Sequence, residues 1–170
     1  LEARQITFVT GGIRTDRLME LLYRRYELDV KTAGLKYTLT TRRENALREG
    51  FSTVDVDLER MHQVFGNLIA NAIKFTPAGG AILVEMTDDG ELMHCRITDT
   101  GDGVNPEDLP FVFDRFYTGN KSRNAANGCK GLGLSIAKEI IEYHNGTIWI
   151  ERTAPRQGTV LCFRLPIEKA

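Results

Sequence analysis

The 170 residues are enough for one domain with a sizeable core, and 42% hydrophobic and 26% charged residues are ordinary for a globular protein. A net charge of -1 without a long basic run does not favour nucleic acid as a partner. No apolar run approaches the ~20 residues that cross a bilayer, and the N-terminus lacks a signal-peptide pattern. Three widely spaced cysteines predict neither a disulfide framework nor a zinc site. We expect a soluble, monomeric, cytoplasmic fragment, and membrane anchoring of the parent protein stays open.

The first third of the chain predicts short strands around one helix. Residues 5–9 alternate weakly and precede Gly11-Gly12, which indicates a strand followed by a turn. Apolar residues spaced through 16–33 predict one helix that stops at Gly34. Residues 35–41 alternate as a half-buried strand, 42–50 form a charged connection, and 52–56 predict another short strand.

The remainder predicts a helix, a hairpin, a long loop and a final helix with two strands. Asp57 is suited to cap a helix that ends at 76–80. Asp88-Asp89-Gly90 predicts an antiparallel hairpin of strands 81–87 and 92–98. A loop over 101–130 precedes a helix over 132–143 and strands over 147–152 and 159–165. We expect an α/β two-layer sandwich: a mixed, mostly antiparallel sheet with three helices on one face.

Polar residues form a stripe along the helix that follows Asp57. At 100° per residue, Gln63, Asn67, Asn71 and Lys74 share a narrow arc, while the neighbouring arc is apolar (Met61, Val64, Phe65, Leu68, Ala72 and Phe75). Asparagine is a mediocre helix former, so two of them one turn apart suggest a use for their side-chain oxygens. Such oxygens suit magnesium, with phosphates completing its coordination. A solvated amide face is the alternative reading of this segment.

Two glycine-containing segments are candidates for contacts with a ligand. Asp99-Thr100-Gly101-Asp102-Gly103 follows a strand, so the Asp99 carboxylate can accept a hydrogen bond from a ligand amine, although any turn also prefers Asp and Gly. Gly128 to Ser135 leads into a helix whose free amides could bind phosphates. This segment fits neither a Walker loop nor a dinucleotide-binding fingerprint, and a plain loop end is the alternative.

These motifs, in this order, resemble the nucleotide-binding domain of sensor histidine kinases. The asparagine helix, Asp-x-Gly-x-Gly, the aromatic cluster of Phe111, Phe113, Phe116 and Tyr117, and Gly-x-Gly-Leu correspond to the family's N, G1, F and G2 boxes. The resemblance covers about residues 50 to 166, including Tyr143 to Ile150. It implies the ATP-binding sandwich shared by gyrase, Hsp90-type chaperones, histidine kinases and mismatch-repair proteins, with ATP and magnesium as cofactors.

The resemblance also implies roles for individual residues. Asn71 would be the magnesium ligand, Asn67 would lie at the metal-phosphate side of the helix, and Lys74 would contact phosphate. Asp99 would accept the adenine amino group, supported by Thr159 through water. The other implied ATP-binding residues are Phe75, Gly101, Gly103, Tyr117, Lys130, Gly131, Leu132, Gly133 and Leu134. Residues 101–130 would form the ATP lid, with its mobile part from Asn105 to Lys130.

Asn67 bears on the type of reaction. ATP-hydrolysing relatives of this fold typically carry Glu at this position as a base that activates water, and Asn cannot accept that proton. Its presence favours transfer of the γ-phosphoryl group to a histidine, where positioning and charge neutralisation dominate catalysis. Thr118 replaces an arginine that is common in the family, so phosphate neutralisation would fall to Arg115, Lys121 or Arg123.

The phosphoacceptor itself is not expected in this chain. None of His62, His94 and His144 stands in the His-Glu/Asp-x-x-Arg context of an acceptor helix. Residues 1–14 resemble the family's exit from its dimerisation helices, so we expect 1–170 to be a single catalytic domain whose partners are that dimerisation domain and a response regulator. A slow ATPase of this fold, or a nucleotide-binding module without phosphotransfer, remains the alternative.

Overall fold

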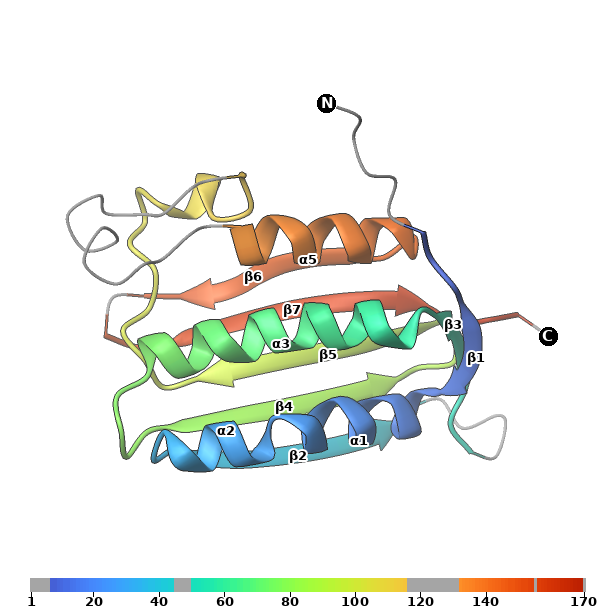
Figure 1. The fold of residues 1–170 in the computed structure, drawn as a ribbon, viewed down its shortest axis with the longest axis horizontal. Helices are drawn as coiled ribbons and strands as arrows, with labels where there is room; N and C mark the ends of the chain where they lie inside the picture. Colours follow the sequence, from blue (N-terminus) through green and yellow to red (C-terminus); the bar gives the residue numbers. More distant parts are fainter. Residues whose placement is uncertain (1–6, 45–49, 116–131, 155, 170) are drawn as a thin grey trace.

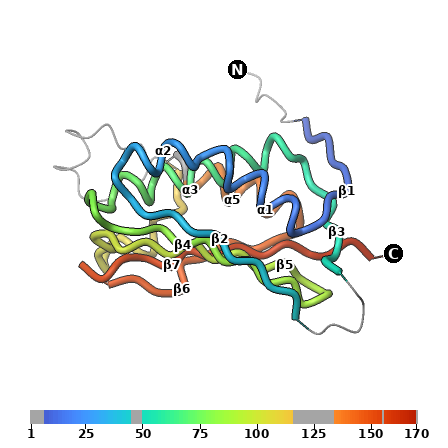
Figure 2. Tube along the Cα trace, turned by 90° about the horizontal axis from the view of Figure 1, so that it is seen from below, coloured from blue at the N-terminus to red at the C-terminus, as the bar shows by residue number. Residues whose placement is uncertain are grey.

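The computed structural model describes residues 7–44, 50–115, 132–154 and 156–169. These residues form two layers, with helices above a five-stranded sheet (Figure 2). The strands follow the order β2 (Lys36–Arg43), β4 (Ala81–Asp88), β5 (Leu92–Asp99), β7 (Thr159–Pro166) and β6 (Thr147–Thr153). Only the β2–β4 pair is parallel, so the predicted mixed, mostly antiparallel sheet is confirmed.

The helices cover one face of the sheet, as predicted (Figure 1). They are α1 (Thr15–Arg25), α2 (Glu27–Thr32), α3 (Leu58–Phe75) and α5 (Leu132–Tyr143), and a short 3-10 helix, η1 (Leu109–Phe111), interrupts the loop after β5. The single helix expected over 16–33 is wrong, because the helix breaks at Tyr26 between α1 and α2. Tyr26 donates its hydroxyl to the His62 carbonyl at 2.7 Å. Its ring fills the space beside Gly66, so a tertiary contact accompanies the break.

The first strand lies later in the chain than the alternation predicted. Residues 7–10 are not in a strand, and Gly11-Gly12 begins β1 (Gly11–Arg14), which pairs antiparallel with β3 (Thr53–Val56) in a small separate sheet. Phe8, in the segment expected to be a strand, stacks instead on Tyr143 with ring centroids 3.5 Å apart. Its ring packing outweighs the weak alternation that suggested a strand.

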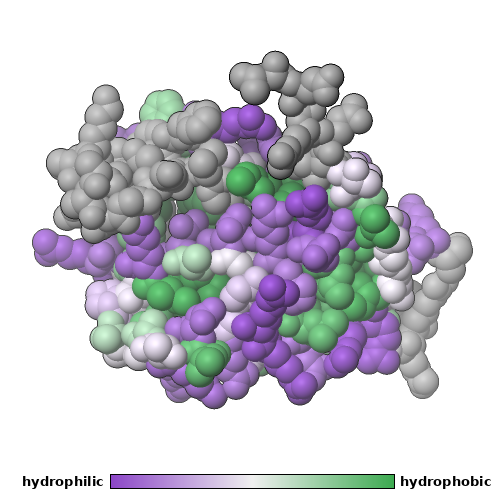
Figure 3. Space-filling model, in the orientation of Figure 1, coloured by the Kyte–Doolittle hydropathy of each residue, from purple (hydrophilic) through white to green (hydrophobic). Residues whose placement is uncertain are grey.

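The core lies between the helices and the sheet. Alternate residues of β4 and β5 are buried, and α3 turns its apolar face toward them. Fully burying each large apolar side chain contributes about 1.5–3 kcal/mol relative to exposure. The largest of these buried side chains include Phe65, Met61, Ile69, Ile82, Met86, Met93, Ile140 and Phe163. The outer face of the helices is mainly hydrophilic, with separate hydrophobic areas (Figure 3).

The N-terminal end of α3 is held by a chain of hydrogen bonds. Asp57 caps the helix as predicted, accepting from the Arg60 amide at 3.1 Å, and also accepts from the Val9 amide at 2.8 Å. The Asp57 amide donates to Nε2 of the buried His144, whose Nδ1 lies 2.7 Å from the Ile140 carbonyl. These bonds join the start of α3 to the end of α5 and to the segment that precedes β1.

Candidate functional site

The polar stripe of α3 lies on the helix face that the core leaves uncovered. Asn67 and Asn71 are half-buried, and Lys74 is exposed. At the other end of the stripe, Gln63 accepts a hydrogen bond from Arg60 at 3.2 Å. Phe75 departs from the predicted apolar arc, because 43% of its surface is exposed. The last two turns of α3 therefore present two amides, a cation and an aromatic ring outside the core.

Asp99 lies at the end of β5, opposite Ile82 on β4 and Thr159 on β7. Its Oδ1 accepts from the Gly101 amide at 2.9 Å. Burial raises the pKa of the Asp99 carboxyl, and hydrogen bonds from the Gly101 and Thr159 amides only partly oppose this effect. A half-buried carboxylate with few donors favours a ligand that offers a further N–H group.

The loop after β5 is hydrogen-bonded to the end of α3. The Asp102 amide donates to the Phe75 carbonyl at 3.0 Å. A Cβ atom on Gly101 would lie 2.4 Å from that same carbonyl oxygen, so this close approach requires glycine. The contact brings Asp99 and the exposed Phe75 ring to the same end of the sheet.

The turn between β6 and β7 supports the other side of this loop. Gly158 donates its amide to the Gly101 carbonyl at 2.9 Å, and the Val104 amide donates to Thr153 Oγ1 at 2.8 Å. Thr153 Oγ1 also lies 3.0 Å from Thr159 Oγ1. Gly103 has φ +74, and a Cβ there would lie 2.0 Å from the Ala154 carbonyl oxygen.

These supporting residues were not singled out in the sequence. Thr100, Thr153 and Gly158 acquire their roles from hydrogen bonds between distant segments. The sequence analysis predicted strands on either side of this turn, over 147–152 and 159–165, but not the contact of Gly158 with Gly101.

The first turn of α5 lies at the same end of the sheet as the C-terminal end of α3 (Figure 1). Leu132 and Gly133 begin this helix, and half-buried Leu134 packs against the core. The amides of a first helical turn lack partners within the helix and carry partial positive charge, so this terminus can receive an anion. The asparagine stripe, the Asp99 loop and the start of α5 are thus brought together.

Of the basic residues expected to contact the γ-phosphate, only Arg115 lies within the described residues. Arg115 forms an exposed ion pair with Glu139 on α5. This pairing with Glu139 raises the pKa of Arg115. Among the described residues no cluster of three His, Cys, Asp or Glu side chains could hold a metal ion, so a cation here would depend on amide oxygens and ligand phosphates. Predicted positions outside the described residues are Tyr117, Lys121, Arg123, Lys130 and Gly131.

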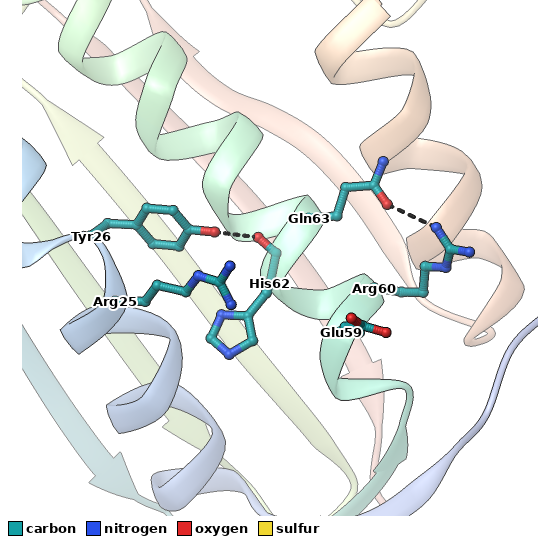
Figure 4. A pocket seen from close by; sticks show the side chains of 6 residues that line it. All are labelled: Arg25, Tyr26, Glu59, Arg60, His62 and Gln63. Carbon is teal, nitrogen blue, oxygen red and sulfur yellow. Dashed lines mark hydrogen bonds between the residues drawn. The ribbon is translucent and has the colours of Figure 1, made fainter.

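A separate cavity of about 470 Å³ lies at the N-terminal half of α3; Gln63 of the polar stripe lines it, but none of the implied ATP-binding residues does. Its side chains diverge: Arg25 lies beside His62 on one side of the helix, whereas Arg60 turns toward Gln63 on the other (Figure 4). Glu59 lies among them and offsets part of their charge. The predicted site is therefore at the other end of α3.

Comparisons with known proteins agree with this arrangement. Residues 56–169 match the family described as "Histidine kinase-, DNA gyrase B-, and HSP90-like ATPase". The chain is 37% identical over 118 residues to the sensor histidine kinase WalK of Bacillus subtilis, covering 68% of this chain and 19% of WalK. It is 36% identical over 117 residues to the histidine-protein kinase BaeS of Escherichia coli, covering 69% of this chain and 25% of BaeS.

Solved structures show the same fold. The catalytic domain of the histidine kinase ThkA matches with a TM-score of 0.74 and 26% identity, covering 94% of this chain and 96% of that one. ThkA in complex with the response regulator TrrA matches with a TM-score of 0.71 and 26% identity, covering 94% of this chain and 42% of that one. Among the described residues no helix has the length and apolar character needed to cross a membrane.

Proposed function

Because the chain belongs to the family of histidine kinase-, DNA gyrase B- and HSP90-like ATPases, we propose that it is the catalytic domain of a sensor histidine kinase. It binds Mg-ATP and transfers the γ-phosphoryl group to a histidine on a separate dimerisation domain, leaving ADP. The main support is the gathering of the asparagine stripe, Asp99 and the start of α5 at one end of the sheet.

The base of the nucleotide lies at the Asp99 loop in this proposal. The Asp99 carboxylate accepts a hydrogen bond from the adenine amino group, which suits a half-buried acid with few donors whose pKa is raised by partial burial. Gly101 and Gly103 line the base pocket, Thr159 supports Asp99 through water, and the exposed Phe75 ring lies beside the nucleotide.

The phosphates lie between α3 and α5. Asn71 holds magnesium through its amide oxygen, and Asn67 lies at the metal-phosphate side of the helix. Lys74 and the backbone amides of Gly131, Leu132, Gly133 and Leu134 contact the phosphates. Held at Asn71, magnesium would supply positive charge to the phosphates. Lys130 and Tyr117 contact the nucleotide from the loop, and Arg115 or Lys121 neutralises the γ-phosphate, which for Arg115 requires exchange of its Glu139 partner.

Asn67 favours phosphoryl transfer over hydrolysis, because an amide cannot deprotonate water. We therefore expect the isolated chain to bind ATP and turn it over slowly. A nucleotide-binding module or slow ATPase without phosphotransfer is the second candidate, and the replacement of the family's common arginine by Thr118 favours it.

The partners follow from the same proposal. The chain spans 19% and 25% of the two curated relatives, so the acceptor histidine and the sensing parts are assigned to other segments of a longer protein. We propose that residues 1–14 lead out of the dimerisation domain, that 101–130 form the ATP lid, and that phosphate passes on to a response regulator. The ThkA–TrrA complex is a relative with such a partner.

Nucleotide binding tests the first part of this proposal. Asn71→Ala should weaken magnesium-dependent ATP binding about tenfold or more, measured by isothermal titration calorimetry with and without magnesium. Gln63→Ala is the matched control, because it removes an amide from the same helix face two turns earlier. Equal magnesium-dependent affinity in wild type and Asn71→Ala would contradict the assignment.

Phosphotransfer tests the second part. The chain, mixed with a histidine-bearing dimerisation domain and γ-labelled ATP, should place label on that histidine. Robust release of inorganic phosphate without labelled protein would support the ATPase instead.

A further inference from the structure

We propose that Thr76 is a positioning residue for the base of the bound nucleotide, because its buried hydroxyl, beside the Asp99 loop, has no partner among the residues that the structure describes. The inference rests on the proposed function and extends it to a residue immediately after α3. The hydroxyl forms its hydrogen bond only when nucleotide is present, with the base or with one water that the base orders.

The starting observation is an unpaired polar atom. Thr76 is 5% exposed, and among the described residues its Oγ1 has no hydrogen-bond partner. Buried side-chain hydroxyls are nearly always paired, since leaving one unpaired carries a desolvation cost. An exception beside a proposed ligand site therefore indicates a group that the ligand completes.

The neighbouring polar groups already have partners. The Phe75 carbonyl accepts from Asp102, and Thr100 Oγ1 accepts from the Ala81 amide at 2.9 Å. The Gly101 amide donates to Asp99. Without nucleotide, the donors and acceptors of the loop after β5 are thus used in hydrogen bonds that close the corner between α3, β4 and β5.

Gly80 and Gly101 let two backbone segments approach Thr76 closely. A Cβ on Gly101 would lie 2.8 Å from Thr76 Oγ1, and a Cβ on Gly80 would lie 2.5 Å from Thr76 Cγ2. The hydroxyl therefore faces the backbone of Gly101, two residues beyond Asp99, while the methyl group packs toward Gly80. The two branches of the side chain have different surroundings: the methyl fills the corner beside Gly80, and the buried hydroxyl lies against Gly101 at the base end of the site.

Two comparisons at position 76 test this assignment, because Thr differs from Val, and Ser from Ala, by the hydroxyl group. Thr76→Val removes the hydroxyl and keeps the branched shape, while Thr76→Ser keeps the hydroxyl and removes the methyl. Thr76→Ala against Thr76→Ser repeats the comparison without the methyl and remains usable if the Val variant does not fold. Each protein is titrated calorimetrically with Mg-ADP, and its melting temperature is measured without nucleotide.

The hydroxyl should affect affinity, and the methyl should affect stability. We expect Thr76→Val to bind Mg-ADP about three- to tenfold more weakly with an unchanged or higher melting temperature, because a neutral hydrogen bond is lost and an unpaired polar atom is removed. Thr76→Ser should keep wild-type affinity with a lower melting temperature, and Ala should bind more weakly than Ser by the same factor.

The failure of this inference is distinct from failure of the proposed function. Wild-type affinity for Mg-ADP in both Val and Ala variants would overturn the role of Thr76 and leave nucleotide binding intact. Absence of Mg-ADP binding by the wild-type chain would overturn the proposed function and this inference with it.

Discussion

Asp88 and Asp99 end neighbouring antiparallel strands at opposite ends of the sheet, and their surroundings differ in the number of donors. Asp88 is fully buried, accepts from Thr15, Ser52 and Gly90, and pairs with Arg43 at 3.2 Å. Asp99 receives two backbone amides. Burial would raise the pKa of both carboxyls, yet the hydrogen bonds of Asp88 outweigh burial and lower its pKa, whereas the pKa of Asp99 stays raised.

The difference separates a structural carboxylate from one suited to a ligand. Donors from three segments saturate Asp88 and join the ends of β2 and β4 to the start of α1 and the segment before β3. Asp99 retains capacity for another N–H group, at the end of the molecule where the Thr76 hydroxyl also has no partner in the described part of the chain. A fold that is stable at one end can leave hydrogen-bonding capacity unused at the other.

We expect the largest change in stability for Asp88→Asn. The substitution removes the charge opposite Arg43 and turns an amide N–H toward groups that already donate. We expect a loss of about 3–5 kcal/mol in the free energy of unfolding, measured by urea denaturation. Asp55→Asn, at an exposed position on β3, should change it by less than about 0.5 kcal/mol. Folded Asp88→Asn should bind Mg-ADP as wild type does, and weak binding by the folded fraction would break the division between the two ends.

Asp99→Asn should have the opposite profile. Loss of a charge-assisted hydrogen bond to the base should weaken Mg-ADP binding about 10- to 100-fold by calorimetry. Stability should be unchanged or slightly higher, because burial disfavours the ionised Asp99 in the folded state. Asp102→Asn changes an exposed neighbour in the same loop and should retain affinity. A stability loss in Asp99→Asn as large as that in Asp88→Asn would mean that both aspartates are structural.

Periodicity and capping predicted the elements near these aspartates because the signals were local. The Asp57 cap, the Asp88-Asp89-Gly90 hairpin and the helix over 132–143 are confirmed. The break at Tyr26 and the position of β1 were not predictable in this way, because a hydroxyl bond to His62 and ring stacking on Tyr143 join segments far apart in sequence.

The site shows the same limit. Asn71 and Asp99 could be selected because motif order fixed their place, and their roles remain predictions. Thr76 carried no motif of its own, and its unpaired hydroxyl is visible only once Gly80 and Gly101 are packed around it. A saturated carboxylate such as Asp88 was likewise indistinguishable from any hairpin aspartate in the sequence.

Acid should affect the two aspartates with opposite signs. The folded-state pKa of Asp88 is lowered, so its stabilisation is present above the unfolded pKa of ~3.9 and is lost as pH falls through the folded value. That of Asp99 is raised, so its contribution is present at low pH and is lost as pH rises through the folded value. Unfolding free energies measured between about pH 2.5 and 6 should therefore fall less on acidification in Asp88→Asn than in wild type, and more in Asp99→Asn. Parallel curves for all three proteins would contradict the assigned pKa directions.

The smallest expected effect concerns His62, whose buried Nδ1 has no hydrogen-bond partner within the described segments and lies away from the nucleotide site. Burial, and then the charge of Arg25, lowers its pKa, so its contribution to stability is present above the unfolded pKa of ~6.5 and is lost as pH falls through the folded value. His62→Gln should remove a small part of the stability lost between about pH 7 and 5, measured by urea denaturation. Arg25→Gln should remove a smaller part, because burial is the larger cause. Affinity for Mg-ADP should stay unchanged in both variants at neutral pH. If the affinity for Mg-ADP falls, His62 at the N-terminal half of α3 also contributes to nucleotide binding. The difference between the two ends of the sheet would then rest on Asp88 and Asp99 alone.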